Sequence, residues 1–324
     1  MLIDCHAHLN FQAYANDRNE VINRCQNMKV INIGSQYPTS RLALELARKN
    51  KNMFASVGLH PIHVGGQEYD ENEVREKVEM SDEEQLVKIK ELLATDKDNR
   101  IVAVGETGLD YFHFDSKKQE NKKTKKQEEV FLKHIELARG FNKPLMLHCR
   151  GAKDNPEEAY RDMLKIINYQ LSQPQPKADG HLAQKAGLLQ KGMGPWSKPL
   201  AEIINNYKIQ GMIHCFSSTV DIAQRFINLG FYLGFTGIIT FPLRRGSGSS
   251  TNAGELVNVV KQTPLNHIFT ETDCPYLAPQ PVRGQRNEPS YVKYIVEEIA
   301  KIKGIGYDEV ITAVEENARE LFGV

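Results

Sequence analysis

The chain has 324 residues, and its 41 Lys and Arg residues balance its 41 Asp and Glu residues, so the formal net charge is zero. Hydrophobic residues make up 40% of the chain and charged residues 25%, which is typical of a soluble globular protein and excludes the disordered and fibrous classes. No apolar run approaches the ~18 residues of a membrane span. Zero net charge also disfavours the broad cationic face with which histone-like proteins grip duplex DNA.

The cysteines and the first residues indicate a cellular compartment. There are five cysteines with wide spacing and no CxxC pair, which argues against both a disulfide framework and a zinc knuckle. The segment that begins at Met1 has no basic region followed by a long apolar stretch, so no secretory signal is visible. We therefore expect reduced, buried thiols and a cytoplasmic protein, with the nucleus as a second location.

Short apolar runs alternate along the chain with longer segments of helical period. Serine and acidic residues at 81–84 form a capping-box pattern that predicts the start of a helix, with Ser81 and Glu84 as its two partners. The other expected helices are 18–28, 39–50, 127–140, 156–170, 221–229 and those after 290. The expected strands are 1–4, 30–33, 54–57, 101–104, 144–147, 211–213, 231–233 (continuing toward 238) and 268–270.

About eight strand–helix units favour a closed (β/α)8 TIM barrel over an open doubly wound sheet. No GxGxxG or GxxxxGK[ST] segment follows any of the strands, so the phosphate loop of nucleotide-binding α/β proteins is missing. We expect a single domain over residues 1–324, with surface insertions near 65–80, 116–126 and 172–197.

Histidines and acids follow five of the expected strands. Residues two apart on a strand point the same way, so the two histidines after the first strand project together. In a barrel the carboxyl ends of all strands meet at one face, where active sites are built. The residues that would converge there are His6, His8, Glu106, His148, His214 and Asp273.

These residue types predict a metal site. A single histidine at a strand end is more often a hydrogen-bonded core residue, but four histidines and two acids at one end of five strands are hard to explain by chance. Imidazole and carboxylate ligands suit zinc, manganese, iron or magnesium. Six ligands exceed the needs of one tetrahedral ion and fit two ions bridged by a carboxylate. Such a centre keeps a positive charge, which favours an anionic substrate such as a phosphate.

The chain resembles the TatD-family metal-dependent deoxyribonucleases of the amidohydrolase-type barrels. Eight matching segments follow in the family's order from residue 4 to residue 322, which covers essentially the whole chain. They are Asp4-Cys-His-Ala-His8, Gly58-Leu-His-Pro61, Gly105-Glu-Thr-Gly-Leu-Asp-Tyr111, Leu147-His-Cys-Arg150, Ile213-His-Cys-Phe-Ser217, Glu271-Thr-Asp-Cys-Pro-Tyr-Leu277, Arg286-Asn-Glu-Pro289 and Glu316-Asn-Ala-Arg-Glu-Leu-Phe322.

The resemblance implies a distribution of the ligands. His6, His8 and Asp273 would hold the first metal, His148 and His214 the second, and Glu106 would bridge the two ions. Family members hydrolyse phosphodiester bonds in DNA, often from the 3′ end, with Mg, Mn or Zn. We therefore expect two divalent ions, a DNA substrate that is single-stranded or engaged at its 3′ end, with RNA left open, no membrane partner and a monomeric chain.

Four residues receive roles in the expected hydrolysis. Asp273 is the expected general base, because a carboxylate that touches both metal and water can take the proton. His60 could contact the scissile phosphate or protonate the leaving oxygen, or else be a structural turn histidine. Arg150 and Arg286 are candidate phosphate contacts, with a buried salt bridge and a plain surface position as the alternatives.

Two further readings stay open. An amidase, a lactonase or a D-aminoacyl-tRNA deacylase could use the same centre, although such barrels often bridge their metals with a modified lysine where this chain has Glu106. A catalytically silent scaffold would have lost ligands, whereas all six are present.

Lysines 117, 118, 122, 123, 125 and 126 could attract nucleic acid or form a solvated loop before the fourth helix.

Overall fold

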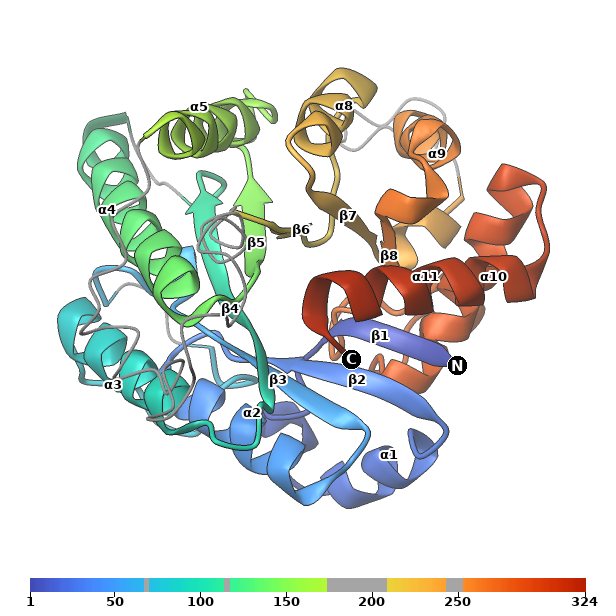
Figure 1. The fold of residues 1–324 in the computed structure, drawn as a ribbon, viewed down its shortest axis with the longest axis horizontal. Coiled ribbons are helices and arrows are strands. Elements are labelled where there is room, and N and C mark those ends of the chain that lie inside the picture. The colour runs from blue at the N-terminus through green and yellow to red at the C-terminus, as the bar shows by residue number, and fades with distance from the viewer. Residues whose placement is uncertain (67–69, 114–116, 174–208, 243–252) are drawn as a thin grey trace, which may run out of the picture.

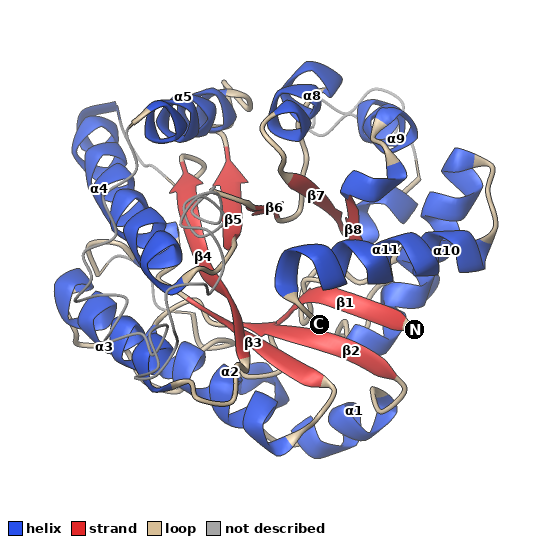
Figure 2. Ribbon diagram, in the orientation of Figure 1, coloured by secondary structure: helices blue, strands red, loops and turns tan. Residues whose placement is uncertain are grey.

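A computed structural model describes residues 1–66, 70–113, 117–173, 209–242 and 253–324. Eight parallel strands pair in the order in which they occur in the chain. They form a nearly closed barrel with the helices outside it (Figures 1 and 2), so the predicted TIM barrel is confirmed. The strands are β1 (Leu2–Ala7), β2 (Met28–Ile33), β3 (Met53–Val57), β4 (Ile101–Asp110), β5 (Leu145–Arg150), β6 (Gly211–Ile213), β7 (Tyr232–Phe235) and β8 (Ile268–Thr270).

Helices connect the successive strands, as a parallel barrel requires. Within the described ranges they are α1 (Arg18–Arg24), α2 (Tyr37–Lys49), α3 (Asp82–Thr95), α4 (Lys117–Phe141), α5 (Glu158–Ser172), α8 (Val220–Asn228) and α9 (Ala253–Gln262), followed after β8 by α10 (Val292–Lys303) and α11 (Tyr307–Phe322). The predicted capping box starts α3, where the Ser81 hydroxyl and the Glu84 carboxylate satisfy each other's backbone amides. None of the described helices combines the length and the apolarity that crossing a bilayer would require.

The seam between β1 and β8 is closed at the carboxyl end of the barrel. The Thr270 hydroxyl donates to the Ile3 carbonyl at 2.9 Å. Further along, the Asp273 amide donates to the His6 carbonyl at 2.9 Å and the His8 amide to the Cys274 carbonyl at 3.0 Å. These bonds tie the segment after β8 to the end of β1, so the side chains of the two segments share one space.

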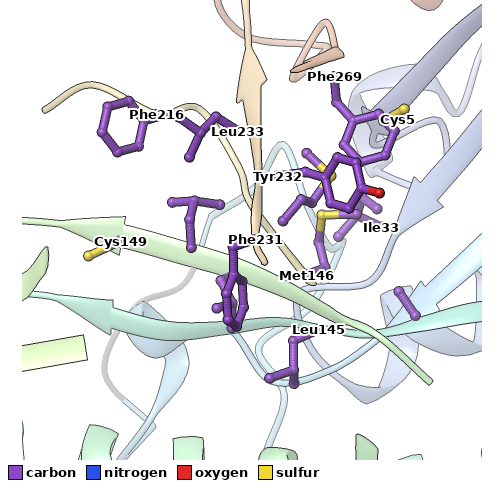
Figure 3. Packing of buried hydrophobic residues seen from close by; sticks show 14 of the residues in the cluster. Cys5, Ile33, Leu145, Met146, Cys149, Phe216, Phe231, Tyr232, Leu233 and Phe269 are labelled. Atoms are coloured by element: carbon purple, nitrogen blue, oxygen red, sulfur yellow. The ribbon is translucent and has the colours of Figure 1, made fainter. Parts of the chain in front are cut away.

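Apolar side chains of the strands pack in a large buried cluster together with those of the surrounding helices. Ile33, Met146, Leu233 and Phe269 are almost fully buried and belong to one cluster (Figure 3). The five cysteines are free thiols, and all but Cys215 are buried. This agrees with the expectation of reduced, buried thiols for all of them except Cys215, which is partly exposed.

Strand β4 is six residues longer than the predicted strand over 101–104. Two glycines allow it to run close against β5. A Cβ at Gly105 would lie 2.2 Å from the Met146 carbonyl oxygen, and one at Gly108 would lie 2.1 Å from the His148 carbonyl oxygen. The extension carries Glu106 and Asp110 to the carboxyl end of the barrel beside β5.

Three other expectations are corrected. Helix α4 begins at Lys117, so the lysine-rich segment is its first half and not a loop; Lys, Gln and Glu are good helix formers, which explains the early start. The segment after β7 turns into a short 3₁₀ helix (Gly237–Thr240) and does not continue as a strand. Helix α9 was not predicted. The insertion expected over 172–197 lies almost entirely outside the described residues.

Candidate metal centre

The Glu106 carboxylate lies at the middle of the histidine cluster. Its Oε2 atom is 3.2 Å from Nε2 of His6, and its Oε1 atom is 3.1 Å from Nδ1 of His148 and 3.3 Å from Nε2 of His60. The residue is only 3% exposed. One carboxylate oxygen therefore faces a histidine of β1, and the other faces one histidine of β5 and one of the loop after β3.

Asp273 completes the side of the cluster that β1 and β8 form. Its Oδ1 atom is 3.4 Å from Nε2 of His8, 3.6 Å from Nε2 of His214 and 3.8 Å from Nε2 of His6. The His6 and His214 rings are stacked with their centroids 3.4 Å apart. All six residues that the sequence predicted as ligands thus meet in one place.

The grouping of these residues differs from the expected one. Three sets have ligand atoms within 4.8 Å of one another: His6, His214 and Asp273; His6, His8 and Glu106; and His60, Glu106 and His148. The expected pairing of His148 with His214 is not among them, because the His214 ring stacks on His6 and faces Asp273. Glu106 belongs to two of the three sets, as a bridging ligand would.

The hydrogen bonds of His8 indicate that the centre suits a cation. Its Nδ1 atom is 3.0 Å from the Ile33 carbonyl, which only accepts, so Nδ1 carries the hydrogen. In the neutral ring, Nε2 is then a bare lone pair, and it lies 3.1 Å from Nε2 of His6. His6 Nδ1 is buried and has no hydrogen-bond partner among the described residues.

Protonation does not supply the missing hydrogens at His6. Burial and the nearby charge of His214 lower the pKa of His6 to about 3. At neutral pH this ring therefore brings at most one hydrogen. Burial lowers the pKa values of His8 and His214, but the nearby carboxylates outweigh burial and raise both, so without a metal these acids draw extra protons onto the two rings. A divalent cation could replace such protons, because it fits this set of nitrogen and oxygen atoms.

His148 is oriented by a carboxylate that the sequence reasoning missed. Asp110 Oδ2 lies 2.9 Å from Nε2 of His148, on the opposite side of the ring from Glu106. Burial lowers the pKa of His148, but hydrogen bonds to Asp110 and Glu106 outweigh it and raise the pKa to about 9. Asp110 fixes the Nε2 hydrogen, so a metal that displaced the other hydrogen of the ring would meet Nδ1, the atom that faces Glu106. Metal-binding histidines are commonly fixed in this way.

Glu271 lies beside His214 and was also missed. Its Oε1 atom is 3.1 Å from Nδ1 of His214 and accepts a hydrogen bond from the Cys215 amide at 2.5 Å. Gly234 on β7 makes room for this acid, since a Cβ there would lie 2.6 Å from the carboxylate. The sequence spacing could have predicted this position, because Glu271 precedes Asp273 by two residues and residues two apart in an extended chain point the same way.

His60 faces the centre as a hydrogen-bond donor. Its Nδ1 atom accepts from the Ile62 amide at 3.1 Å and caps a short 3₁₀ helix (Pro61–His63). The hydrogen of the neutral ring is therefore on Nε2, the atom that faces Glu106. The preceding residue, Leu59, is held by its amide's hydrogen bond to buried His134, at 3.0 Å. This tautomer suits contact with a substrate oxygen better than coordination of a metal.

The two candidate arginines have different surroundings. Arg150 is exposed, and its guanidinium carbon lies 3.7 Å from the centre of the Phe112 ring. Arg286 forms a two-armed ion pair with Asp17 and also donates to the Ala13 carbonyl at 2.7 Å. A phosphate would therefore have to compete with Asp17 for Arg286, whereas Arg150 forms no ion pair with a carboxylate among the described residues.

Comparison with known proteins places this centre in context. The family model described as TatD related DNase matches residues 3–323. An uncharacterized metal-dependent hydrolase of Bacillus subtilis, YabD, is 34% identical over 100% of both chains. An uncharacterized metal-dependent hydrolase of Escherichia coli, YcfH, is 26% identical over 100% of this chain and 96% of its own.

Solved structures show the same architecture. The TatD homologue YJJV of Escherichia coli superposes with a TM-score of 0.70 at 22% identity, covering 100% of this chain and 98% of its own. A TatD-family hydrolase from Entamoeba histolytica superposes with a TM-score of 0.65 at 21% identity, covering 99% and 97%. At these identities the likeness supports the barrel fold alone.

Proposed function

The chain belongs to the TatD-related DNase family, and we propose that it is a metal-dependent deoxyribonuclease that removes nucleotides from the 3′ end of DNA. The coarser part of this statement, a TatD-type metal-dependent hydrolase, rests on the family match along the chain and on curated relatives that carry that name. The substrate and the direction of cleavage are the proposal.

The position of Glu106 is the observation that carries the proposal. Its two carboxylate oxygens face histidines of two different groups, at 3.2 Å and 3.1 Å. A carboxylate in that position suits a pair of cations better than one. Two divalent ions, when bound, supply a nucleophilic hydroxide at neutral pH and offset the negative charge that develops on a phosphate in the transition state.

The chain's own residues then have three tasks. The Asp273 carboxylate takes the proton of the attacking water; its side chain is 16% exposed, so water reaches it. Burial raises the pKa of Asp273, but the charge of His214 and of the other nearby histidines outweighs burial and keeps the pKa low, so the base is ionised at neutral pH. His60 donates its Nε2 hydrogen to a phosphate oxygen. Asp110 orients the His148 ring, and Glu271 lies against the His214 ring.

The test is an assay of the purified protein on 3′-labelled and 5′-labelled single- and double-stranded DNA. The protein is first treated with a chelator and then titrated separately with Mg, Mn and Zn. We expect metal-dependent release of the 3′ label, faster on single-stranded DNA, and loss of release in Asp273→Asn.

Parallel assays with RNA and with a D-aminoacyl-tRNA separate the competing readings. A metal-restored protein that hydrolyses the aminoacyl ester and leaves every DNA substrate intact would contradict the proposed deoxyribonuclease and favour the ester-hydrolase reading of the same centre.

A further inference from the structure

We propose that Phe112, Arg150 and Lys153 form a second phosphate subsite, which binds the nucleic-acid phosphate next to the one that is cleaved. The inference rests on the proposed function, because it assigns a further contact to the same substrate. It extends that function by predicting that the protein holds at least two consecutive phosphates of a strand.

The subsite consists of two cations placed on one aromatic ring. The Arg150 guanidinium carbon is 3.7 Å from the centre of the Phe112 ring, and Nζ of Lys153 is 4.8 Å from it. Both cationic side chains are exposed. Among the residues that the structure describes, neither forms an ion pair with a carboxylate. The two positive charges are therefore left without a neutralising partner in a chain of zero net charge.

Asp110 connects this cluster to the metal centre. Its Oδ2 atom holds His148, while its Oδ1 atom accepts hydrogen bonds from the Phe112 amide at 3.0 Å and from Nδ1 of His113 at 2.9 Å. Arg150 follows His148 by two residues at the end of β5, and its carbonyl accepts the Tyr111 amide at 2.8 Å. The turn that carries Phe112 is thus fixed to the same carboxylate that orients a candidate ligand.

Binding a phosphate explains this arrangement better than stabilising the fold does. An exposed cation–aromatic contact contributes only about 0.5–1 kcal/mol, too little to explain two unneutralised charges as a structural device. A guanidinium lying on a ring keeps its N–H groups at the edge, where they can fork onto two phosphate oxygens. Because Phe112 restrains the guanidinium, less side-chain entropy is lost when an anion binds.

The test measures binding, so that it does not depend on turnover. A fluorescently labelled single-stranded oligonucleotide with phosphorothioate linkages, which slow hydrolysis, is titrated with the metal-loaded protein at several salt concentrations. The variants are Lys153→Ala and Phe112→Leu. The control is Lys301→Ala on helix α10, a lysine that pairs with Glu298 at 3.1 Å and has no described contact with Phe112, Arg150 or Lys153.

We expect Lys153→Ala to weaken binding by about five- to tenfold at low salt and to reduce the slope of log Kd against log salt by about 0.7, the value for one phosphate contact on a single strand. Phe112→Leu should weaken binding severalfold because the guanidinium loses its support. Lys301→Ala should change neither quantity by more than a small long-range amount.

A second comparison separates this inference from the proposed function. The ratio of kcat/KM on an oligonucleotide to kcat/KM on bis(p-nitrophenyl) phosphate, which has a single phosphate, should fall in Lys153→Ala. Binding and salt slope that match those of Lys301→Ala overturn the subsite even if the enzyme is an active nuclease. A wild-type protein that binds the oligonucleotide as expected but cleaves no phosphodiester overturns the nuclease and leaves the subsite supported.

Discussion

Two buried clusters of histidines and carboxylates lie at the carboxyl ends of the barrel strands, and they differ in how fully their polar atoms are hydrogen-bonded. The first is the candidate metal centre around Glu106. The second, which we call the Glu73 clasp, consists of Ser35, His63 and Glu73. In the clasp, the Glu73 carboxylate accepts the Ser35 hydroxyl at 2.6 Å and pairs with Nε2 of His63 at 2.9 Å.

The clasp is a complete hydrogen-bonded unit, whereas the centre is not. The segment that carries Glu73 is also bound through its backbone, since the Gln12 amide donates to the Glu73 carbonyl at 3.0 Å. In the centre, by contrast, the lone pair of His8 meets His6 at 3.1 Å and a buried nitrogen of His6 lacks a partner. Buried polar groups that lack donors mark a site for a ligand, while satisfied ones mark a structural role.

We expect the largest effect from a change of Glu106, the carboxylate that two of the histidine groups share. Glu106→Gln keeps the shape of the side chain but removes the charge that both histidine groups face. We expect kcat to fall by at least roughly 10³-fold, as when a member of a cooperating catalytic set is removed. Metal content measured by mass spectrometry should fall from two ions per chain to one or none. Unchanged metal content and near-normal turnover would contradict the bridging role.

The matched change in the clasp is Glu73→Gln. Breaking a buried pair by removing one charge typically costs about 3–5 kcal/mol of stability. We expect a loss of that size in urea unfolding, equal with chelator and with metal, because the clasp binds no ion. The variant should keep its metal content. A loss of stability that appears only in the metal-loaded protein would show that Glu73 belongs to the metal centre, and the two clusters would then not differ as described.

We expect the smallest effect from a change of Asp110, the carboxylate that orients the His148 ring. In Asp110→Asn the amide no longer compels Nε2 of His148 to carry the hydrogen, so the Nδ1 lone pair is less well fixed. We expect a ten- to hundredfold weaker affinity for one of the two ions, as is usual for carboxylates behind a metal-binding histidine. Competition with a chromophoric chelator measures this affinity.

The control for that variant is Asp162→Asn, which removes a carboxylate that accepts the Tyr111 hydroxyl at 3.3 Å and does not contact the centre in any described interaction. Equal effects of the two variants on metal affinity would show that the loss comes from general charge and not from the orientation of His148.

The sequence alone was sufficient for the barrel and for the ligand types. Strand-like runs and helical periods are local properties, and polar residues at strand ends reach one face of any parallel barrel. That rule brought His6, Glu106 and Asp273 into one prediction although more than 260 residues separate the first from the last.

Only the tertiary structure decided which of these side chains face each other. His214 stacks on His6 and does not join His148, Asp110 and Glu271 hold two imidazoles from behind, and Arg286 pairs with Asp17. These pairings depend on the stagger of neighbouring strands, on rotamers and on loop contacts between distant residues. None of those quantities has a period or a spacing in the chain, so the sequence determined which groups enter the centre and the folded barrel determined their partners.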